Sequence, residues 1–257
     1  MAFVLLAVLL VGRAALSGGV PVGAASAGLP VEVLEWLAEY GHLPAPTPGD
    51  LGAVPQVAVT GAIESAQLEM GLPPTGEVAA EFLALTRAPR CGVRSAPVRS
   101  RRYALAGTRW RRSPIRWRLD ASHPSLPVAE VRQVMEAIWS DYRNATLLEF
   151  EEVSSAADIV VKFVRPDHPC LGGAMSAQTL AHAFFPSSGG DIHIKDSLQS
   201  SVDLHAVIGH EAGHALGLQH SRNPAALMYA YYHPIAPGDP YLHSDDVAGI
   251  RRLYGRR

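Results

Sequence analysis

The stretch His210-Glu-Ala-Gly-His-Ala-Leu-Gly-Leu-Gln-His220 decides how the rest of this chain is interpreted. Residues four apart share one face of an α-helix, so His210 and His214 would point the same way and could chelate one metal ion. Gly217 can adopt the left-handed backbone conformation at little cost, end the helix and bring His220 back as a third ligand. Three protein ligands leave a fourth position open for water, as a catalytic zinc requires. Glu211 would lie beside that water as the general base.

Two further observations bear on this interpretation. A helix can carry two solvated histidines at this spacing by chance, but the glycine and the third histidine at set distances favour a metal site. Met228 follows closely, as the Met-turn does in the metzincin signature, although on its own it would be assigned to the core.

The composition narrows the class of protein. Its 257 residues carry 22 basic and 24 acidic side chains and a net charge of −2, so we expect neither nucleic acid nor a membrane as a partner. The two cysteines, Cys91 and Cys170, are too few for a disulfide framework, although a single bridge between them is an alternative. The apolar run over residues 3–11 is too short to span a membrane, and small residues follow it. We interpret residues 1–27 as a secretory signal peptide rather than a buried strand, and we expect a secreted monomer.

The next part of the chain predicts a small helical bundle. Apolar periodicity and proline or glycine breaks indicate helices over residues 31–40, 60–70 and 77–86, and the bundle ends at Pro89-Arg-Cys-Gly-Val93. Cys91 is either a small buried thiol or a ligand at the open zinc position. As a thiolate ligand it would displace the catalytic water and keep the enzyme silent.

With Pro-Arg-Cys-Gly-Val (89–93) beside the HExxHxxGxxH segment, the chain resembles the matrix metalloproteinases and their cysteine switch. The similarity includes residues 38–43, 71–76, 180–186 and 244–250. It implies an α/β fold of the α+β metzincin type: a twisted, mostly parallel sheet with three helices, preceded by a small three-helix pro-domain. The family's Pro-Asp after the switch is Arg94-Ser95 here. Since that aspartate braces the switch arginine in the family, we expect looser latency.

The basic run Arg99-Ser-Arg-Arg102 is either a solvated linker or a furin-type convertase site. In a secreted zymogen we favour cleavage after Arg102, which would make Tyr103 the new N-terminus. The predicted divisions are therefore a signal peptide at 1–27, a propeptide at 28–102 and a zinc metalloprotease domain at 103–257.

The predicted catalytic domain mixes strands and helices. Alternating apolar residues predict strands over residues 115–119, 147–153, 158–164, 181–185 and 191–195. Amphipathic or zinc-binding patterns predict helices over residues 128–142, 202–216 and 244–254, the last with Ser244 as its N-cap. Asn144 begins an Asn-Ala-Thr glycosylation sequon.

The resemblance also implies sites for further metal ions. The family's structural zinc uses three histidines and an aspartate, which match His168, His182, His193 and, in the aspartate position, Cys170. Thiolate is a good zinc ligand, so a site of this composition is chemically sound; the alternative is a weaker or absent site. One family calcium site is expected to be lost, because Lys195 and Leu198 replace two carboxylates and the lysine charge can replace the ion. A second possible calcium site matches Asp158, Gly189 and Asp191.

The function implied is that of a secreted zinc-dependent endopeptidase, made as a cysteine-switch zymogen and acting on extracellular or matrix proteins. Tissue inhibitors of metalloproteinases are expected partners. Substrate would pair with the edge strand near residues 180–184, beside a specificity pocket walled by residues 229–232. We expect neither a propeller domain nor a fibronectin-like insert, and so a minimal, matrilysin-like layout with weak binding to collagen fibrils. The alternatives are an astacin- or reprolysin-type metzincin and a zinc-stabilised interaction module without catalysis.

Overall fold

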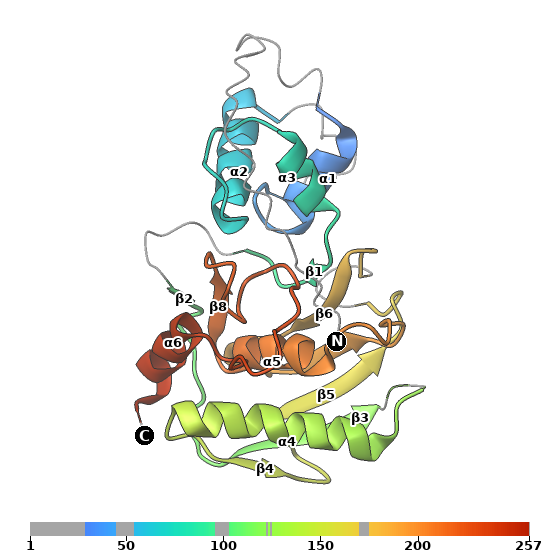
Figure 1. Ribbon diagram of the computed structural model, residues 1–257, viewed down its shortest axis with the longest axis vertical. Helices are drawn as coiled ribbons and strands as arrows, with labels where there is room; N and C mark the ends of the chain where they lie inside the picture. The colour runs from blue at the N-terminus through green and yellow to red at the C-terminus, as the bar shows by residue number, and fades with distance from the viewer. Residues whose placement is uncertain are drawn as a thin grey trace, which may run out of the picture.

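The computed structural model describes residues 29–44, 54–95, 103–121, 123, 125–169 and 175–256. The predicted signal peptide, Arg102 and Cys170 lie outside the described residues. Figure 1 shows a smaller helical lobe, formed by α1, α2 and α3, above a larger lobe that contains the sheet. The short strand β1 lies where the two lobes meet.

The helices of the smaller lobe are α1 (Val31–Glu39), α2 (Gln56–Glu69) and α3 (Ala80–Thr86), which confirms the predicted three-helix unit. α2 begins four residues before the predicted start, directly after Pro55. At α1 the first residue, Val31, is 57% exposed, while Val33 and Trp36 are buried. The core of this lobe also takes in Tyr229 and Tyr231 from the larger lobe, so the two lobes share a hydrophobic interface.

The sheet has the strand order β1-β6-β7-β5-β3-β4. Its members are β1 (Arg90–Cys91), β6 (Thr179–Ala183), β7 (Ile192–Lys195), β5 (Ile159–Val164), β3 (Ile115–Ala121) and β4 (Phe150–Glu152). Every neighbouring pair is parallel except β6 and β7, which confirms the expectation of a mostly parallel sheet. β2 (Tyr103–Leu105) and β8 (Leu218–Ser221) form a separate antiparallel pair. Strands of two to four residues such as β1, β2 and β8 carry too little alternation to be predicted from sequence.

Three helices complete the larger lobe: α4 (Val128–Ala145), α5 (Leu204–Ala215) and α6 (Ser244–Tyr254). α4 and α5 pack together over the sheet (Figure 1), where Trp139 of α4 and Trp117 of β3 are fully buried. The N-cap of α6 is His243 and not Ser244 as predicted. The His243 side chain accepts a hydrogen bond from the backbone of α6, and Asp246 bonds back to the His243 N–H. This capping box satisfies free N–H groups that a serine one residue later does not reach.

Candidate active site

The helix α5 carries the first two predicted ligands. Asp203 precedes the helix and accepts hydrogen bonds from the backbone N–H groups of His205 and Ala206, which satisfies donors left free at a helix start. His210 and His214 follow one turn apart, and both are buried. Residues 206–215 of α5 are all buried, so packing on every side fixes the direction of the two imidazoles.

Gly217 ends this helix and redirects the chain. Its φ is +103°, and a Cβ at this position would lie 2.3 Å from the carbonyl oxygen of Thr108. Only glycine meets both conditions without strain. The chain then enters β8, which contains His220 and places it beside α5. The predicted role of Gly217 is therefore the one that the backbone shows.

The three histidines and Cys91 converge on one point. Their ligand atoms lie within 4.8 Å of one another. The Nδ1 atoms of His210 and His214 lie 2.7 and 2.8 Å from the carbonyl oxygens of Leu227 and Leu218. Since a carbonyl can only accept, each Nδ1 carries the proton and each Nε2 presents a lone pair. The two Nε2 atoms are 3.1 Å apart, and two facing lone pairs suit a bound cation.

The electrostatics keep these ligands neutral and raise the basicity of the neighbouring acid. Burial lowers the pKa of His210 to about 3, so its imidazole does not carry a proton that would compete with a metal. Burial also raises the pKa of Glu211 to about 8, although a hydrogen bond with Cys91 lowers it. A carboxylate with its pKa near neutrality is suited to accept a proton and return it.

Met228, the methionine of the predicted Met-turn, packs against α5 at Gly213, the residue before His214. A Cβ on Gly213 would lie 2.3 Å from the Met228 sulfur, so the thioether packs directly against the backbone of α5. Asp246 holds the turn, because its carboxylate accepts from the backbone N–H groups of Leu227 and Met228. This role of Asp246 was missed by sequence reasoning, since one acid in the first turn of a helix is ordinarily assigned to the helix dipole.

The predicted switch segment, residues 89–93, lies along the edge of the sheet that was predicted to bind substrate. β1 pairs with β6 in parallel, and Arg90 also bridges to Tyr231 on its other side. The Cys91 N–H donates to the carbonyl oxygen of Ala230 at 2.9 Å, and the Gly92 N–H to that of Ala181 at 2.8 Å. A Cβ on Gly92 would lie 2.8 Å from Thr179 Cγ2, so glycine allows this close approach.

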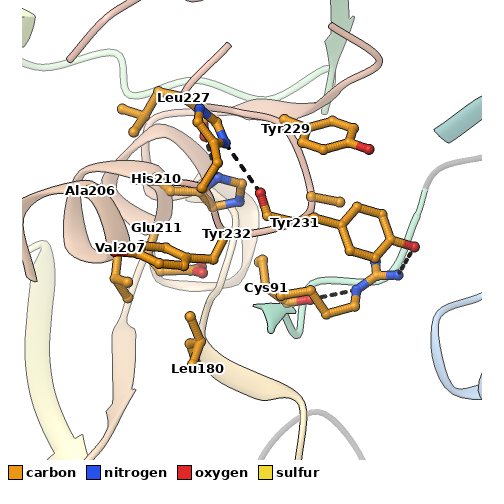
Figure 2. Close-up of a pocket in the computed structure, with 13 residues that line it drawn as sticks. Cys91, Leu180, Ala206, Val207, His210, Glu211, Leu227, Tyr229, Tyr231 and Tyr232 are labelled. Atoms are coloured by element: carbon orange, nitrogen blue, oxygen red, sulfur yellow. Dashed lines mark hydrogen bonds between the residues drawn. The ribbon is translucent and has the colours of Figure 1, made fainter. Parts of the chain in front are cut away.

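An apolar cavity of about 30 Å³ lies beside this cluster. Figure 2 shows Leu180, Val207, Leu227 and Tyr232 around it, with Cys91 and Glu211 at its side. Tyr229, Ala230 and Tyr231 also line it, in the segment that was predicted to form the wall of the specificity pocket. A cavity of this size admits little more than a water molecule, and Arg90 and Cys91 of the predicted switch segment form part of its wall.

The second group of predicted zinc ligands also comes together. The ring centroids of His168 and His193 are 5.1 Å apart, and those of His182 and His193 are 5.0 Å apart. Both ring nitrogens of His182 are buried without a hydrogen-bond partner. Burial, and then the charges of His193 and His168, lowers the pKa of His182 to about 3. The fourth predicted ligand, Cys170, is not among the described residues, so the complete structural zinc site stays a prediction.

The positions of the second predicted calcium site are engaged by basic side chains. Asp158 pairs with Arg112 at 2.6 Å, and Asp191 pairs with Lys162 at 3.6 Å. Gly189 caps a 3₁₀ turn, Pro186–Ser188, with a φ of +104°. These ion pairs compete with calcium for both carboxylates, so the geometry gives this prediction no support.

Lys195, which stands where the resemblance expects a calcium-binding carboxylate, points into the loop before β6. It is 8% exposed, and its Nζ donates to the carbonyl oxygens of Ser176 and Ala177 at 2.8 and 3.3 Å. Backbone carbonyls of a loop are the ligands that calcium favours. An ammonium group that satisfies them makes the ion unnecessary in this loop.

We expect Lys195→Met to lower the free energy of unfolding by about 2–3 kcal/mol, because it leaves two carbonyls without their charged donor. In a chain of this size that corresponds to a Tm lower by about 4–12 °C. Thermal melting with and without added CaCl₂ checks this, and calcium should not move the Tm of the unchanged protein. The control is Lys162→Met, a half-exposed pair worth about 0–1 kcal/mol. A calcium-dependent rise in the Tm of the unchanged protein would contradict the assignment.

Two predicted sites remain, the glycosylation sequon at Asn144 and the new N-terminus at Tyr103. Asn144 is exposed near the end of α4, where a glycan would meet no packed neighbour. Tyr103 begins β2 and pairs with Ser221 of β8. A cut before Tyr103 would therefore leave β2 attached to the strand that carries His220.

Comparison with known proteins identifies the family to which this site belongs. The matrixin pattern of the M10 peptidases matches residues 109–255, more than half of the chain. The chain belongs to the matrixin family. Matrix metalloproteinase-25 of Homo sapiens is 35% identical over 254 residues, which cover 87% of this chain and 44% of that protein. Matrix metalloproteinase-17 of Homo sapiens is 36% identical, covering 87% of this chain and 41% of that protein. Interstitial collagenase of Equus caballus is 38% identical, covering 72% of this chain and 40% of that protein.

This matrixin spans less than half the length of those relatives. No helix among its described residues is long and apolar enough to cross a membrane. The matrixin match begins at residue 109, whereas the similarity to the full-length relatives covers most of the chain. The similarity to these relatives therefore extends into the region that contains the predicted switch segment.

Proposed function

We propose that this matrixin is a secreted zinc-dependent endopeptidase, made as a cysteine-switch zymogen, that cleaves extracellular or matrix proteins. The observation that carries the proposal is the convergence of His210, His214, His220 and Cys91 within 4.8 Å. Glu211 lies beside this cluster and is 1% exposed. A solvated helix face would not bury three histidines and an acid around one point.

The residues of the cluster fit a zinc ion. Three imidazoles and a thiolate form a closed tetrahedral donor set, and the imidazole Nδ1 atoms are already held by hydrogen bonds. With the thiolate withdrawn, zinc held by the three histidines would polarise a scissile carbonyl and lower the pKa of its bound water.

The side chains of this protein then supply proton transfer and positioning. Glu211 accepts the proton of the attacking water and returns it to the leaving amine. The exposed edge of β6, once vacated by β1, offers its backbone groups to an extended peptide. The cavity lined by Leu180, Val207 and Tyr232 favours a hydrophobic side chain just after the cleaved bond, and removal of the switch segment enlarges it.

The remaining assignments belong to the same proposal. A furin-type convertase cuts after Arg102, residues 1–27 direct secretion, and tissue inhibitors of metalloproteinases block the active form. His168, His182 and His193, with Cys170, hold a structural zinc. The likeness to named matrix metalloproteinases supports protein substrates, and the proximity of the three rings supports the second zinc.

The test is peptide cleavage by the convertase-processed chain on a mixed quenched peptide library. We expect cleavage that a zinc chelator abolishes and that added zinc restores, with hydrophobic residues enriched just after the cut. Cleavage unaffected by the chelator would contradict the metal mechanism. A folded, zinc-loaded chain that cleaves no peptide would exclude the enzyme and favour a zinc-stabilised interaction module.

A further inference from the structure

Glu69, the last residue of α2, occupies an unusual place for a carboxylate. Its residue exposure is 6%, and the helix that carries it belongs to the smaller lobe. Even so, its side chain reaches the metal cluster of the larger lobe, because Oε1 lies 3.0 Å from Nδ1 of His220. Burying an acid costs free energy unless each oxygen has a partner. The contacts of Glu69 therefore indicate which groups it stabilises.

The two oxygens of Glu69 bind four side chains from separate parts of the chain. Oε1 accepts from Ser95 Oγ at 2.5 Å and faces His220, while Oε2 lies 3.1 Å from Nε2 of His42. Oε2 also pairs with Nη2 of Arg90 at 3.5 Å. The carboxylate of Glu69 thus has the guanidinium of Arg90 on one oxygen and the hydroxyl of Ser95 on the other.

Arg90, beside the switch cysteine, depends on this anion. Its exposure is 0%, and its guanidinium lies 3.7 Å from the ring centroid of Tyr40 and 4.9 Å from that of Tyr231. Its Nε donates to the carbonyl oxygen of Cys91 at 3.2 Å. Among the described residues, Glu69 is the one carboxylate within ion-pair distance of Arg90. A buried cation without its counter-ion is strongly unfavourable.

Position 95 shows why the carboxylate comes from α2. The resemblance places the family's bracing aspartate at residue 95, which is serine here. The Ser95 hydroxyl donates to Glu69, so its side chain points at the same place. An aspartate at this position would set a second anion against Glu69, whereas serine offers a proton. In this chain the acid that faces Arg90 is therefore Glu69 of α2 and not a residue of the switch segment, and the Ser95 hydroxyl donates a hydrogen bond to it.

We propose that Glu69 helps to keep the zymogen inactive. Its carboxylate binds both Arg90 and His220, and so holds Cys91, the neighbour of Arg90, at the predicted zinc site. We call this role of Glu69 the latch. The proposal rests on the proposed function, because it concerns how the same metal site is kept silent. It predicts firm latency, in contrast to the looser latency expected from the altered switch. It also makes latency depend on the fold of the smaller lobe, since the counter-ion of Arg90 is carried by α2.

The test uses the full chain with Arg101→Ala and Arg102→Ala, which blocks convertase processing. Four chains are compared in this background: the otherwise unchanged zymogen, Glu69→Gln, Glu69→Gln with Ser95→Asp, and Glu77→Gln. Glu77 is an exposed acid of the same lobe and serves as the matched control. Cys91→Ser is the reference for an unlocked zymogen.

Two quantities are measured on each unprocessed chain. One is peptide hydrolysis, and the other is the rate of Cys91 alkylation, followed by peptide mapping so that Cys170 is counted separately. We expect Glu69→Gln to raise both by at least about tenfold, Ser95→Asp to reverse both changes, and Glu77→Gln to leave both unchanged. The rescue distinguishes a latch from a merely structural role.

Each contrary outcome has a defined meaning. If Glu69→Gln raises neither peptide hydrolysis nor the rate of Cys91 alkylation while Cys91→Ser cleaves peptide, the latch is refuted and the peptidase activity is supported. If every unprocessed chain fails to cleave, Cys91→Ser included, the rate of Cys91 alkylation decides the latch, and the convertase-processed chain decides the peptidase. If Glu69→Gln does not fold but the double variant with Ser95→Asp does, the result supports the need for a carboxylate at this place. If neither variant folds, the proposal that an aspartate at position 95 can replace Glu69 is refuted.

Discussion

Replacing Glu211 by alanine should reduce the peptidase rate of the processed chain by about 10³-fold, with zinc retained. General acid–base catalysis contributes roughly 10²–10⁴-fold, and Glu211 is the acid placed beside the cluster, with its pKa raised to about 8 by burial. Its side chain is not needed as a ligand, since three histidines and Cys91 already converge. The loss should therefore appear in kcat with KM little changed.

Initial rates and the zinc content of the same preparation check this prediction. Glu211→Gln keeps the volume of the side chain and should be as inactive as the alanine variant. Glu130→Ala, at an exposed acid in the first turn of α4, should retain full activity. Oε2 of Glu211 is buried without a hydrogen-bond partner, so neither substitution should lower the Tm. Activity within tenfold of the unchanged enzyme would assign the general base elsewhere.

Replacing Gly217 by alanine should lower the free energy of unfolding by about 3 kcal/mol or more and weaken zinc binding. An L-residue with φ near +103° is strained, and its Cβ would lie 2.3 Å from the Thr108 carbonyl oxygen. Relief of that contact must move either the end of α5 or the start of β8. Because β8 carries His220, the third ligand would shift with it.

Gly238→Ala separates the effect of backbone strain from the effect of the close contact with Thr108. Gly238 has a similar φ of +94° but open space where a Cβ would be, so it should cost only about 1–2 kcal/mol from backbone strain. Thermal melting and competition for zinc with a chelating dye measure both effects. Equal losses of stability in the two variants, with unchanged zinc affinity for Gly217→Ala, would show that the close contact does not position His220.

The histidine motif could be predicted from the sequence because its geometry is local. Helical periodicity sets His210 and His214 on one face, and one glycine sets the turn before His220, so short-range backbone rules suffice. The mostly parallel sheet and the three helices of each lobe followed from apolar patterning of long elements and from the family resemblance. Ser244 was wrong as the N-cap of α6, because His243 and Asp246 form a reciprocal pair that the pattern does not reveal.

Only the tertiary structure decided which distant side chains meet at the site. Glu69 and His220 are 151 residues apart, and no periodicity links an acid at the end of α2 to a zinc ligand in β8. Lys195 likewise meets the carbonyls of Ser176 and Ala177 because β7 and the loop before β6 are neighbours in the fold. Sequence determines local conformation through short-range sterics and patterning, whereas buried charges find their partners through the packing of whole elements. The histidines of the candidate site could therefore be named from the sequence, whereas the contact between Glu69 and His220 could not.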